Sequence, residues 1–164
     1  MPIALYRIDD RLIHGQVVVG WGQPLELRFI VLVDDDVADS EWEQELYRMG
    51  VPPGMTVYFH NVTDAALALS GYQADARPGI VLTGNIATMA RLVEAGNGSI
   101  RSVNIGGVHH ASGRVPRLRY VFLNTDEAEG LRGIAVRGVS VTAQDLPGTK
   151  PVQLDDLLTA ALDA

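Results

Sequence analysis

The sequence predicts an α/β protein with an open, mostly parallel twisted sheet of about seven strands and helices on both faces. Three observations lead to this prediction. Short apolar runs rich in β-branched residues recur along the chain, with helix-like segments between most of them. These runs are almost continuously apolar, which is typical of strands covered on both faces. Strands that alternate with helices favour right-handed crossovers, which join parallel strands.

Composition limits the class of protein. The chain has 164 residues, 47% of them hydrophobic, and a formal net charge of −7 from 13 basic and 20 acidic residues. We expect one domain over residues 1–164 with a sizeable core. The acidic balance argues against nucleic acid as a partner, and the absence of cysteine excludes a disulfide framework or a thiolate nucleophile. Since we find neither a signal-peptide pattern nor an apolar run long enough to span a bilayer, we expect a cytoplasmic protein.

Seven apolar runs define the expected strands. They are Ile3–Ile8, Phe29–Val33, Met55–Phe59, Ile80–Thr83, Ser102–Ile105, Tyr120–Leu123 and Val139–Thr142. The connection Gly106–Arg117 contains two adjacent glycines and a proline, so we expect a loop there.

The expected helices lie between these strands. Topology favours a helix at Gly15–Trp21, although its three consecutive valines would suit a strand equally well. The next helix begins at Asp36 or Asp39 and ends at Gly50, just before two prolines. Side chains that can cap a helix N-terminus precede three later helices. These three helices are Ala65–Ser70 after Asn61, Ile86–Ala95 after Asn85, and Asp126–Arg137 after Asn124 or Thr125. A closing amphipathic helix is expected at Gln153–Leu162. We expect the Val17–Trp21 stretch and Trp42 to belong to the core rather than to a subunit contact.

The densest polar cluster in an apolar stretch follows the first strand. It reads Asp9-Asp10-Arg11-Leu12-Ile13-His14-Gly15-Gln16. Ligands of open parallel sheets bind beyond the carboxyl ends of the strands, so this cluster lies where a ligand is expected. A helix that begins here would point the amides of Gly15 and Gln16 at an anion, and Gly15 has no Cβ to obstruct it.

The surroundings of His14 suit a phosphate acceptor better than a general base. A phosphoryl group on an imidazole nitrogen needs donors for its oxygens and a cation for its charge, which the amides and Arg11 would supply. We expect one of Asp9 and Asp10 to pair with Arg7 or Arg11, while the other orients the ring through its second nitrogen. The alternative is that His14 only closes a turn.

Other polar groups are weaker candidates. Thr83 and Asn85 could add phosphate donors to the same crevice, or could form only a turn and a helix cap. The acids Asp34–Asp36 resemble a magnesium or ribose site but also suit the start of a helix. Being adjacent, His109 and His110 would point to opposite faces of a strand, which disfavours a metal site. We expect no metal, because no third ligand lies near the two histidines, and no cofactor, because the sequence contains no glycine motif for a nucleotide.

The run Arg7–Val17 resembles the signature of the enzyme IIB component of the mannose/fructose/sorbose family of the bacterial phosphoenolpyruvate:sugar phosphotransferase system. The resemblance continues through Arg91–Gly96, Val103–Gly107 and Arg137–Val139 and covers essentially the whole chain. It implies a mostly parallel sheet with one antiparallel strand, for which the last strand is the candidate. It also implies that His14 takes a phosphoryl group on Nδ1 from a phosphohistidine of enzyme IIA. The group then passes to a sugar held by the membrane components IIC and IID.

The same resemblance assigns roles within the motif. His14 is the nucleophile and Arg11 the phosphate clamp, Gly15 and Gln16 supply amides, and Asp10 orients the ring. The chain would be the IIB subunit of a protein-Npi-phosphohistidine–sugar phosphotransferase, with IIA as a separate chain and attachment to the inner face of the membrane through IIC and IID. Transfer between two imidazoles passes through a loose transition state, so positioning and charge carry catalysis without a metal.

The sequence alone leaves alternatives to this function open. One is a regulatory phosphoprotein of an incomplete phosphotransferase system, in which phosphorylated His14 has no sugar acceptor. Another is a metal-dependent enzyme that uses His109 and His110.

A docking surface for IIA is also expected. A basic rim that docks an acidic phosphorylated IIA could be formed by Arg114, Arg117 and Arg119. The sequence identifies neither the sugar nor the oligomeric state.

Overall fold

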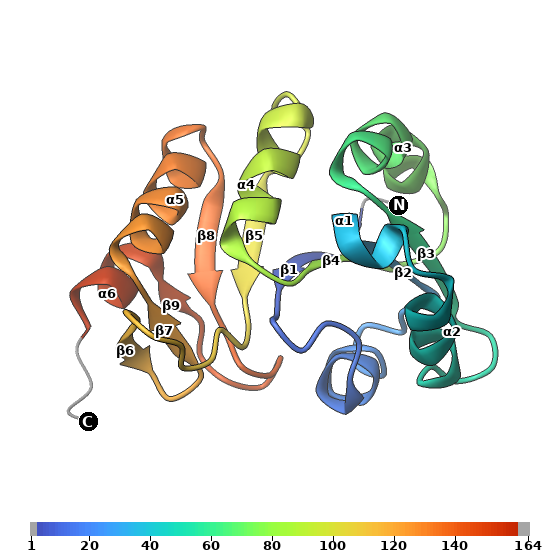
Figure 1. The fold of residues 1–164 in the computed structure, drawn as a ribbon, viewed down its shortest axis with the longest axis horizontal. Coiled ribbons are helices and arrows are strands. Elements are labelled where there is room, and N and C mark those ends of the chain that lie inside the picture. The colour runs from blue at the N-terminus through green and yellow to red at the C-terminus, as the bar shows by residue number, and fades with distance from the viewer. Residues whose placement is uncertain (1–2, 161–164) are drawn as a thin grey trace.

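A seven-stranded sheet runs through the structure, a computed structural model that describes residues 3–160 (Figure 1). The strand order is β3-β2-β4-β1-β5-β8-β9. The strands are β1 (Leu5–Ile8), β2 (Phe29–Val33), β3 (Thr56–His60), β4 (Gly79–Thr83), β5 (Ser102–Ile105), β8 (Ser140–Ala143) and β9 (Val152–Gln153). Neighbours pair in parallel except β8 and β9, which are antiparallel. The predicted sheet, mostly parallel with an antiparallel last strand, is therefore confirmed.

Helices cover both faces of this sheet, as predicted. On one face lies a core cluster that includes Phe29, Val31 and Val33 of β2. It is closed by the helices α3 (Val62–Ala74), α4 (Ile86–Ala95), α5 (Thr125–Val136) and α6 (Leu154–Thr159). Ile30 and Leu32 point the other way, into a second cluster closed by the turn η1 (Gln16–Trp21), α1 (Asp35–Ala38) and α2 (Glu41–Met49). Figure 1 shows α2 at one end of the molecule and α6 at the other.

The seventh strand of the sheet is not the predicted one. We expected Tyr120–Leu123 to join the main sheet, but β7 (Val121–Leu123) pairs antiparallel with β6 (Val115–Leu118) in a separate two-stranded sheet. β6 lies partly in the segment expected to be a loop. The seventh position belongs to β9, in a segment expected to be the start of the last helix. β6 and β9 are too short for apolar periodicity to identify, and only the tertiary pairing defines them.

The predicted helix ending at Gly50 is two helices in the structure. The side chain of Asp34 accepts hydrogen bonds from the N–H groups of Asp36 and Val37, both at 2.9 Å, and so caps α1. The hydroxyl oxygen of Ser40 then accepts from the Glu43 N–H at 3.4 Å and caps α2. The sequence predicted that one helix begins at Asp36 or Asp39, but neither residue is a cap. The first helix is capped by Asp34, and the second cap at Ser40 starts a new helix.

Three other predicted caps are confirmed. Asn61, Asn85 and Asn124 cap α3, α4 and α5, and Asn124 forms a reciprocal capping box with Glu127. α3 is longer than the predicted Ala65–Ser70. The last helix was predicted to reach Leu162, and this end of the prediction lies outside the described residues.

The predicted helix at Gly15–Trp21 is the π-helical turn η1. The Gly22 N–H donates to the carbonyl oxygen of Val17 at 2.8 Å, five residues back. Val17 and Trp21 are buried as expected, but Val19 is half-exposed. Trp42 on α2 was expected in the core and is instead 69% exposed. Within residues 3–160, no helix has the length and apolar character that a membrane crossing requires.

Candidate functional site

The candidate site lies where the loops after β1, β4 and β5 meet, at the carboxyl ends of three adjacent strands. The Asp9 N–H donates to the carbonyl oxygen of Thr83 at 2.9 Å, and the Asp10 N–H donates to that of Gly107 at 2.8 Å. The loop after β1 is thus attached to both neighbouring loops. From β1 the chain crosses over β4 to β2, and from β4 it crosses in the opposite direction over β1 to β5. The direction in which strands are added to the sheet therefore reverses here. Ligands of open α/β sheets bind at such a point.

A buried ion pair lies beneath these loops. The side chains of Arg7 and Asp9 have no exposed surface, and Arg7 Nη2 lies 3.5 Å from Asp9 Oδ2. Arg7 also donates to the side chain of Asn104 and to the carbonyl oxygens of Gln144 at 2.9 Å and Asp145 at 3.2 Å. Burial lowers the pKa of Arg7, and the negative charge of Asp9 opposes that shift. Arg7 keeps its charge, because an arginine does not lose its proton in a protein.

Asp9 is the carboxylate that contacts the ring of His14. Its Oδ1 lies 3.3 Å from His14 Nε2 and 3.3 Å from Arg11 Nε. Burial on its own would raise the pKa of Asp9, but the contacts with His14 and Arg11 and the charge of Arg7 outweigh burial and hold that pKa well below its usual range. At this distance the Asp9 carboxylate stabilises a positive charge on the ring.

The other ring nitrogen of His14 accepts a hydrogen bond. The Gln16 N–H donates to His14 Nδ1 at 3.2 Å. A nitrogen that accepts carries a lone pair, so in the neutral ring the proton is on Nε2, the nitrogen beside Asp9. The side chain of His14 is 17% exposed, and a Cβ at Gly15 would meet no other atom within 4 Å. The ring is therefore held in place beside open space, with a nucleophilic Nδ1.

Arg11 contacts Asp9 and Gln16, the two residues that flank this ring, and its role as a phosphate clamp stays a prediction. Besides its contact with Asp9, its Nη2 donates to Gln16 Oε1 at 2.6 Å, and its side chain is 42% exposed. The other end of the Gln16 amide donates to Asp145 Oδ1 at 2.8 Å. The structure thus brings together His14, Arg11 and Gln16 from the predicted set.

Asp10 does not take the position expected of it. Its Oδ1 lies 2.7 Å from His109 Nδ1, and its Oδ2 accepts from the His109 N–H at 2.7 Å. Asp9 therefore makes both contacts that we had divided between the two acids, since it pairs with arginine and also lies against His14. Asp9 directly follows β1 and lies on the side of Arg7, two residues before it, whereas Asp10 points toward His109. The spacing from Arg7 was a signal that sequence reasoning missed.

Two glycines allow the loop after β5 to lie directly on the ion pair. A Cβ at Gly106 would lie 2.2 Å from Arg7 Nη2 and 2.7 Å from Asp9 Oδ2. A Cβ at Gly107 would lie 2.6 Å from His109 Cε1. The sequence showed these glycines only as signs of a loop, whereas the structure requires them for close approach.

The backbone of Leu12 adopts a left-handed conformation in the middle of the motif. Its φ is 58°, which is uncommon for a residue other than glycine and costs about 1 kcal/mol or more. The Leu12 N–H donates to the carbonyl oxygen of Asp9 at 3.0 Å, and its side chain is buried in the second core cluster. Packing of this side chain therefore holds the strained loop in one conformation.

The contacts of Thr83 and Asn85 are local. The hydroxyl of the buried Thr83 donates to the carbonyl oxygen of Asn85 at 3.4 Å, and Asn85 Oδ1 accepts from the Thr88 N–H at 2.8 Å. These contacts match the alternative of a turn and a helix cap. Phosphate binding by the two residues stays a prediction.

The other predicted clusters serve the fold. The side chain of Asp35 accepts from the Val62 N–H at 3.0 Å and pairs with Arg91 at 3.0 Å, and these two partners lower its pKa. The ring of His110 packs edge-on against Phe122. Among residues 3–160, no three His, Cys, Asp or Glu side chains are grouped so that they could hold a metal ion.

The expected basic rim does not form as a set of outward-facing arginines. Arg114 makes a two-pronged contact with Glu127, at 2.9 and 2.7 Å. Arg117 donates to the carbonyl oxygens of Leu158 and Ala160, both at 2.9 Å. Two of the three arginines are therefore engaged within the protein.

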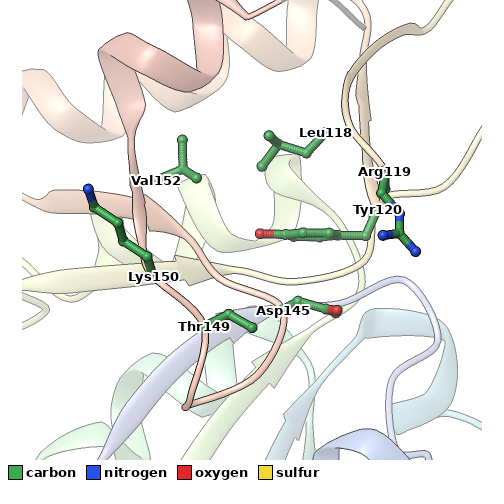
Figure 2. Close-up of a pocket in the computed structure, with 7 residues that line it drawn as sticks. All are labelled: Leu118, Arg119, Tyr120, Asp145, Thr149, Lys150 and Val152. Atoms are coloured by element: carbon green, nitrogen blue, oxygen red, sulfur yellow. The ribbon is translucent and has the colours of Figure 1, made fainter.

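A pocket of about 560 Å³ opens beside the site (Figure 2). It is lined by Leu118, Arg119, Tyr120, Asp145, Thr149, Lys150 and Val152. Figure 2 shows the Tyr120 ring between Leu118 and Asp145, with the charged ends of Arg119 and Lys150 on opposite sides. Asp145 joins this pocket to the site because it accepts the hydrogen bond from Gln16.

Comparison with known proteins gives a consistent result. Residues 3–163 match the family model described as the PTS system sorbose subfamily IIB component. The N-acetylgalactosamine-specific phosphotransferase enzyme IIB component 1 of Escherichia coli (strain K12) is 32% identical over 157 residues, which cover 94% of this chain and 97% of that protein.

Two further similarities are to parts of larger proteins. The PTS system mannose-specific EIIAB component of Escherichia coli (strain K12) is 31% identical over 162 residues, 97% of this chain, and the matched part is 49% of that protein. The crystal structure of the IIBSor domain of the sorbose permease from Klebsiella pneumoniae aligns with a TM-score of 0.86 at 29% identity, covering 99% of this chain and 100% of that one.

Proposed function

The chain belongs to the sorbose subfamily of IIB components of the sugar phosphotransferase system, and from this premise we propose that His14 carries the phosphoryl group on Nδ1. The observation that supports the assignment best is the arrangement around the ring. The Gln16 N–H marks Nδ1 as the nitrogen with the lone pair, and Asp9 lies against Nε2. Both nitrogens are thus given distinct roles before a donor arrives.

The transfer step follows from this arrangement. The Nδ1 lone pair of His14 bonds to phosphorus as the nitrogen–phosphorus bond of the phosphohistidine on IIA breaks, and the donor imidazole leaves with that bonding pair. His14 keeps the proton on Nε2 and so becomes positively charged. The ionised, buried Asp9 stabilises that charge, because it is already in place at 3.3 Å when the charge develops. Arg7 keeps Asp9 in position from beneath.

Arg11 and the first amides of η1 are proposed to receive the phosphoryl oxygens. Arg11 is exposed enough to turn from Gln16 and Asp9 toward a phosphoryl group on Nδ1. The Gln16 N–H, which donates to the bare nitrogen, would then donate to a phosphoryl oxygen. The open space at Gly15 leaves room for the group and its donor. Positioning and charge are sufficient for a loose phosphoryl transfer, and no step requires a metal or another cofactor.

The proposed partners follow from the family. IIA acts as a separate phosphoryl donor, and a sugar held by the membrane components IIC and IID is the acceptor. The protein would act on the cytoplasmic side, bound to the membrane through these components. The fusion of A and B components in the mannose-specific relative supports IIA as the donor. The carbohydrate names of the relatives differ, so they leave the sugar open.

Reconstituted transfer tests this function. Phosphoenolpyruvate, enzyme I, the histidine phosphocarrier and the cognate IIA are incubated with wild type, His14→Ala or His110→Ala, and intact mass and acid lability are measured. We expect an acid-labile phosphoryl group on wild type and on His110→Ala, and none on His14→Ala. Folded wild type that receives nothing from phosphorylated IIA would contradict the proposal. Addition of membranes with IIC and IID then distinguishes a carrier, which loses the group to sugar, from a regulatory phosphoprotein, which keeps it.

A further inference from the structure

Helix α2 presents its apolar stripe to solvent. Trp42, Leu46 and Met49 follow the spacing i, i+4, i+7, and they are 69%, 55% and 75% exposed. The side that faces the protein is held by Gln44, which hydrogen-bonds to the end of α1, and by Tyr47, which packs near the ring of Phe59 on β3. No residue of α2 is buried. Such a stripe normally faces the core, so this one is expected to meet a partner.

The stripe continues toward the phosphorylation loop. A hollow of about 470 Å³ lies between η1 and the end of α2, and Val18, Val19, Leu27, Met49 and Met55 are among the residues that line it. Val19 is 51% exposed on η1, the turn whose first residue contacts His14. We call Val19, Met49, Leu46 and Trp42 the α2 face. A molecule bound to this face would therefore lie next to the turn that carries the His14 contact.

Acidic side chains border the α2 face. Residues 34–49 contain seven Asp and Glu and one arginine. Glu41 and Glu45 are exposed, and the arginine, Arg48, is shared between Glu45 at 3.8 Å and the Phe59 ring. A surface of this charge is repelled by anionic lipid headgroups and attracts basic protein segments. Short cytoplasmic loops of membrane proteins are rich in Lys and Arg.

We propose that the α2 face docks a basic, amphipathic cytoplasmic segment of the membrane component to which His14 delivers its phosphoryl group. This inference rests on the proposed function, because the membrane component is the partner that must reach His14 after IIA has left. Apolar side chains of the segment cover Trp42, Leu46 and Met49, and its basic side chains meet Glu41 and Glu45. The contact continues over Val19 and so brings the acceptor to the phosphorylation loop.

Binding to membranes tests the proposal. Phosphorylated protein is titrated onto vesicles that contain the IIC and IID of its own system, and onto vesicles of the same lipids without them. Trp42→Ser/Leu46→Ser is compared with Leu67→Ser and Val136→Ser, which remove even more exposed apolar side chains from α3 and α5. We expect the double variant to bind about tenfold more weakly or worse, and the two controls to bind like wild type. Glu41→Gln/Glu45→Gln should reduce the dependence of binding on salt.

Phosphorylation in solution separates this inference from the proposed function. The double variant should accept phosphate from IIA at the wild-type rate and melt at the wild-type temperature, because its substitutions are exposed and outside the His14 loop. Unchanged affinity for the IIC/IID vesicles would overturn the inference, as would equal binding to vesicles without these components. It would also be overturned if the double variant converts a wild-type dimer to a monomer, or slows transfer from IIA. A wild type that IIA does not phosphorylate would instead refute the proposed function.

Discussion

The substitution Asp9→Asn removes the charge that connects the buried Arg7 to His14. It keeps the size and shape of the side chain, so the change is electrostatic. Arg7 stays fully buried and charged, with only neutral acceptors left: the Asn104 side chain and the carbonyl oxygens of Gln144 and Asp145. The ring of His14 loses the anion beside Nε2.

The expected loss of stability is large for one substitution. Removal of one partner of a fully buried ion pair costs about 3–5 kcal/mol, and the remaining acceptors of Arg7 place Asp9→Asn near the lower value. For a chain of this size, about 3 kcal/mol corresponds to a fall in melting temperature of about 6–12 °C. Loss of the orienting charge should also slow phosphorylation of His14 about a hundredfold.

Urea unfolding and the rate of transfer from IIA measure both effects. Asp10→Asn is the matched control, because it changes the adjacent acid, whose side chain is 28% exposed and contacts His109 instead of the ion pair. We expect the control to lose less than about 1 kcal/mol. If Asp9→Asn is as stable as Asp10→Asn and accepts phosphate at a similar rate, the role assigned to the buried pair is wrong.

Acid provides a second comparison for the same variant. The pKa of Asp9 is lower in the folded protein than in the unfolded chain, where it is about 3.9. A lowered carboxyl pKa stabilises the folded state above the unfolded pKa, and this stabilisation is lost as pH falls through the folded pKa. The difference in unfolding free energy between wild type and Asp9→Asn should therefore be greatest near pH 7 and shrink below about pH 4.

Three further substitutions test other parts of the site and the fold. Gly106→Ala places a Cβ against Arg7 and Asp9 and should lower the free energy of unfolding in urea by about 2–3 kcal/mol. The control is Gly133→Ala on α5, where a Cβ meets nothing within 4 Å, and it should be neutral or stabilising. Equal effects of the two substitutions would refute the close-approach argument. Arg11→Gln should slow phosphorylation at least about tenfold while changing the melting temperature little, since the side chain is 42% exposed, and an unchanged rate would remove Arg11 from the mechanism. Asn124→Ala removes a capping box and should cost about 1 kcal/mol, seen as a lower urea midpoint with unchanged transfer activity.

The parts of the fold that local signals specify were predictable. Continuous apolar runs located the central parallel strands, and the Asn residues at 61, 85 and 124 marked the helices that the structure contains. The run Tyr120–Leu123 located β7 but not the separate sheet it forms with β6, and β9 was missed, because a run of two or three residues takes its place from the strand it pairs with. The break at Ser40 was missed because the acids before it are equally good caps.

In the site, too, the contacts between residues close in sequence were predictable and those between distant residues were not. The motif placed His14, Arg11 and Gln16 together, since they lie within six residues of one another, in the loop after β1 and at the first residue of η1. Two adjacent aspartates have the same local chemistry, and only their contacts in the fold distinguish Asp9 from Asp10. The contact of Asp10 with His109 joins residues far apart in sequence, so it depends on the strand order.

The ring nitrogens of His14 provide the most direct test of the account. Long-range proton–nitrogen NMR correlations of the imidazole can be measured in the free protein and after transfer from phosphorylated IIA. The arrangement of Gln16 and Asp9 predicts a proton on Nε2 in the free neutral ring, and a phosphoryl group on Nδ1 after transfer. A phosphoryl group on Nε2, or on a histidine other than His14, would contradict it.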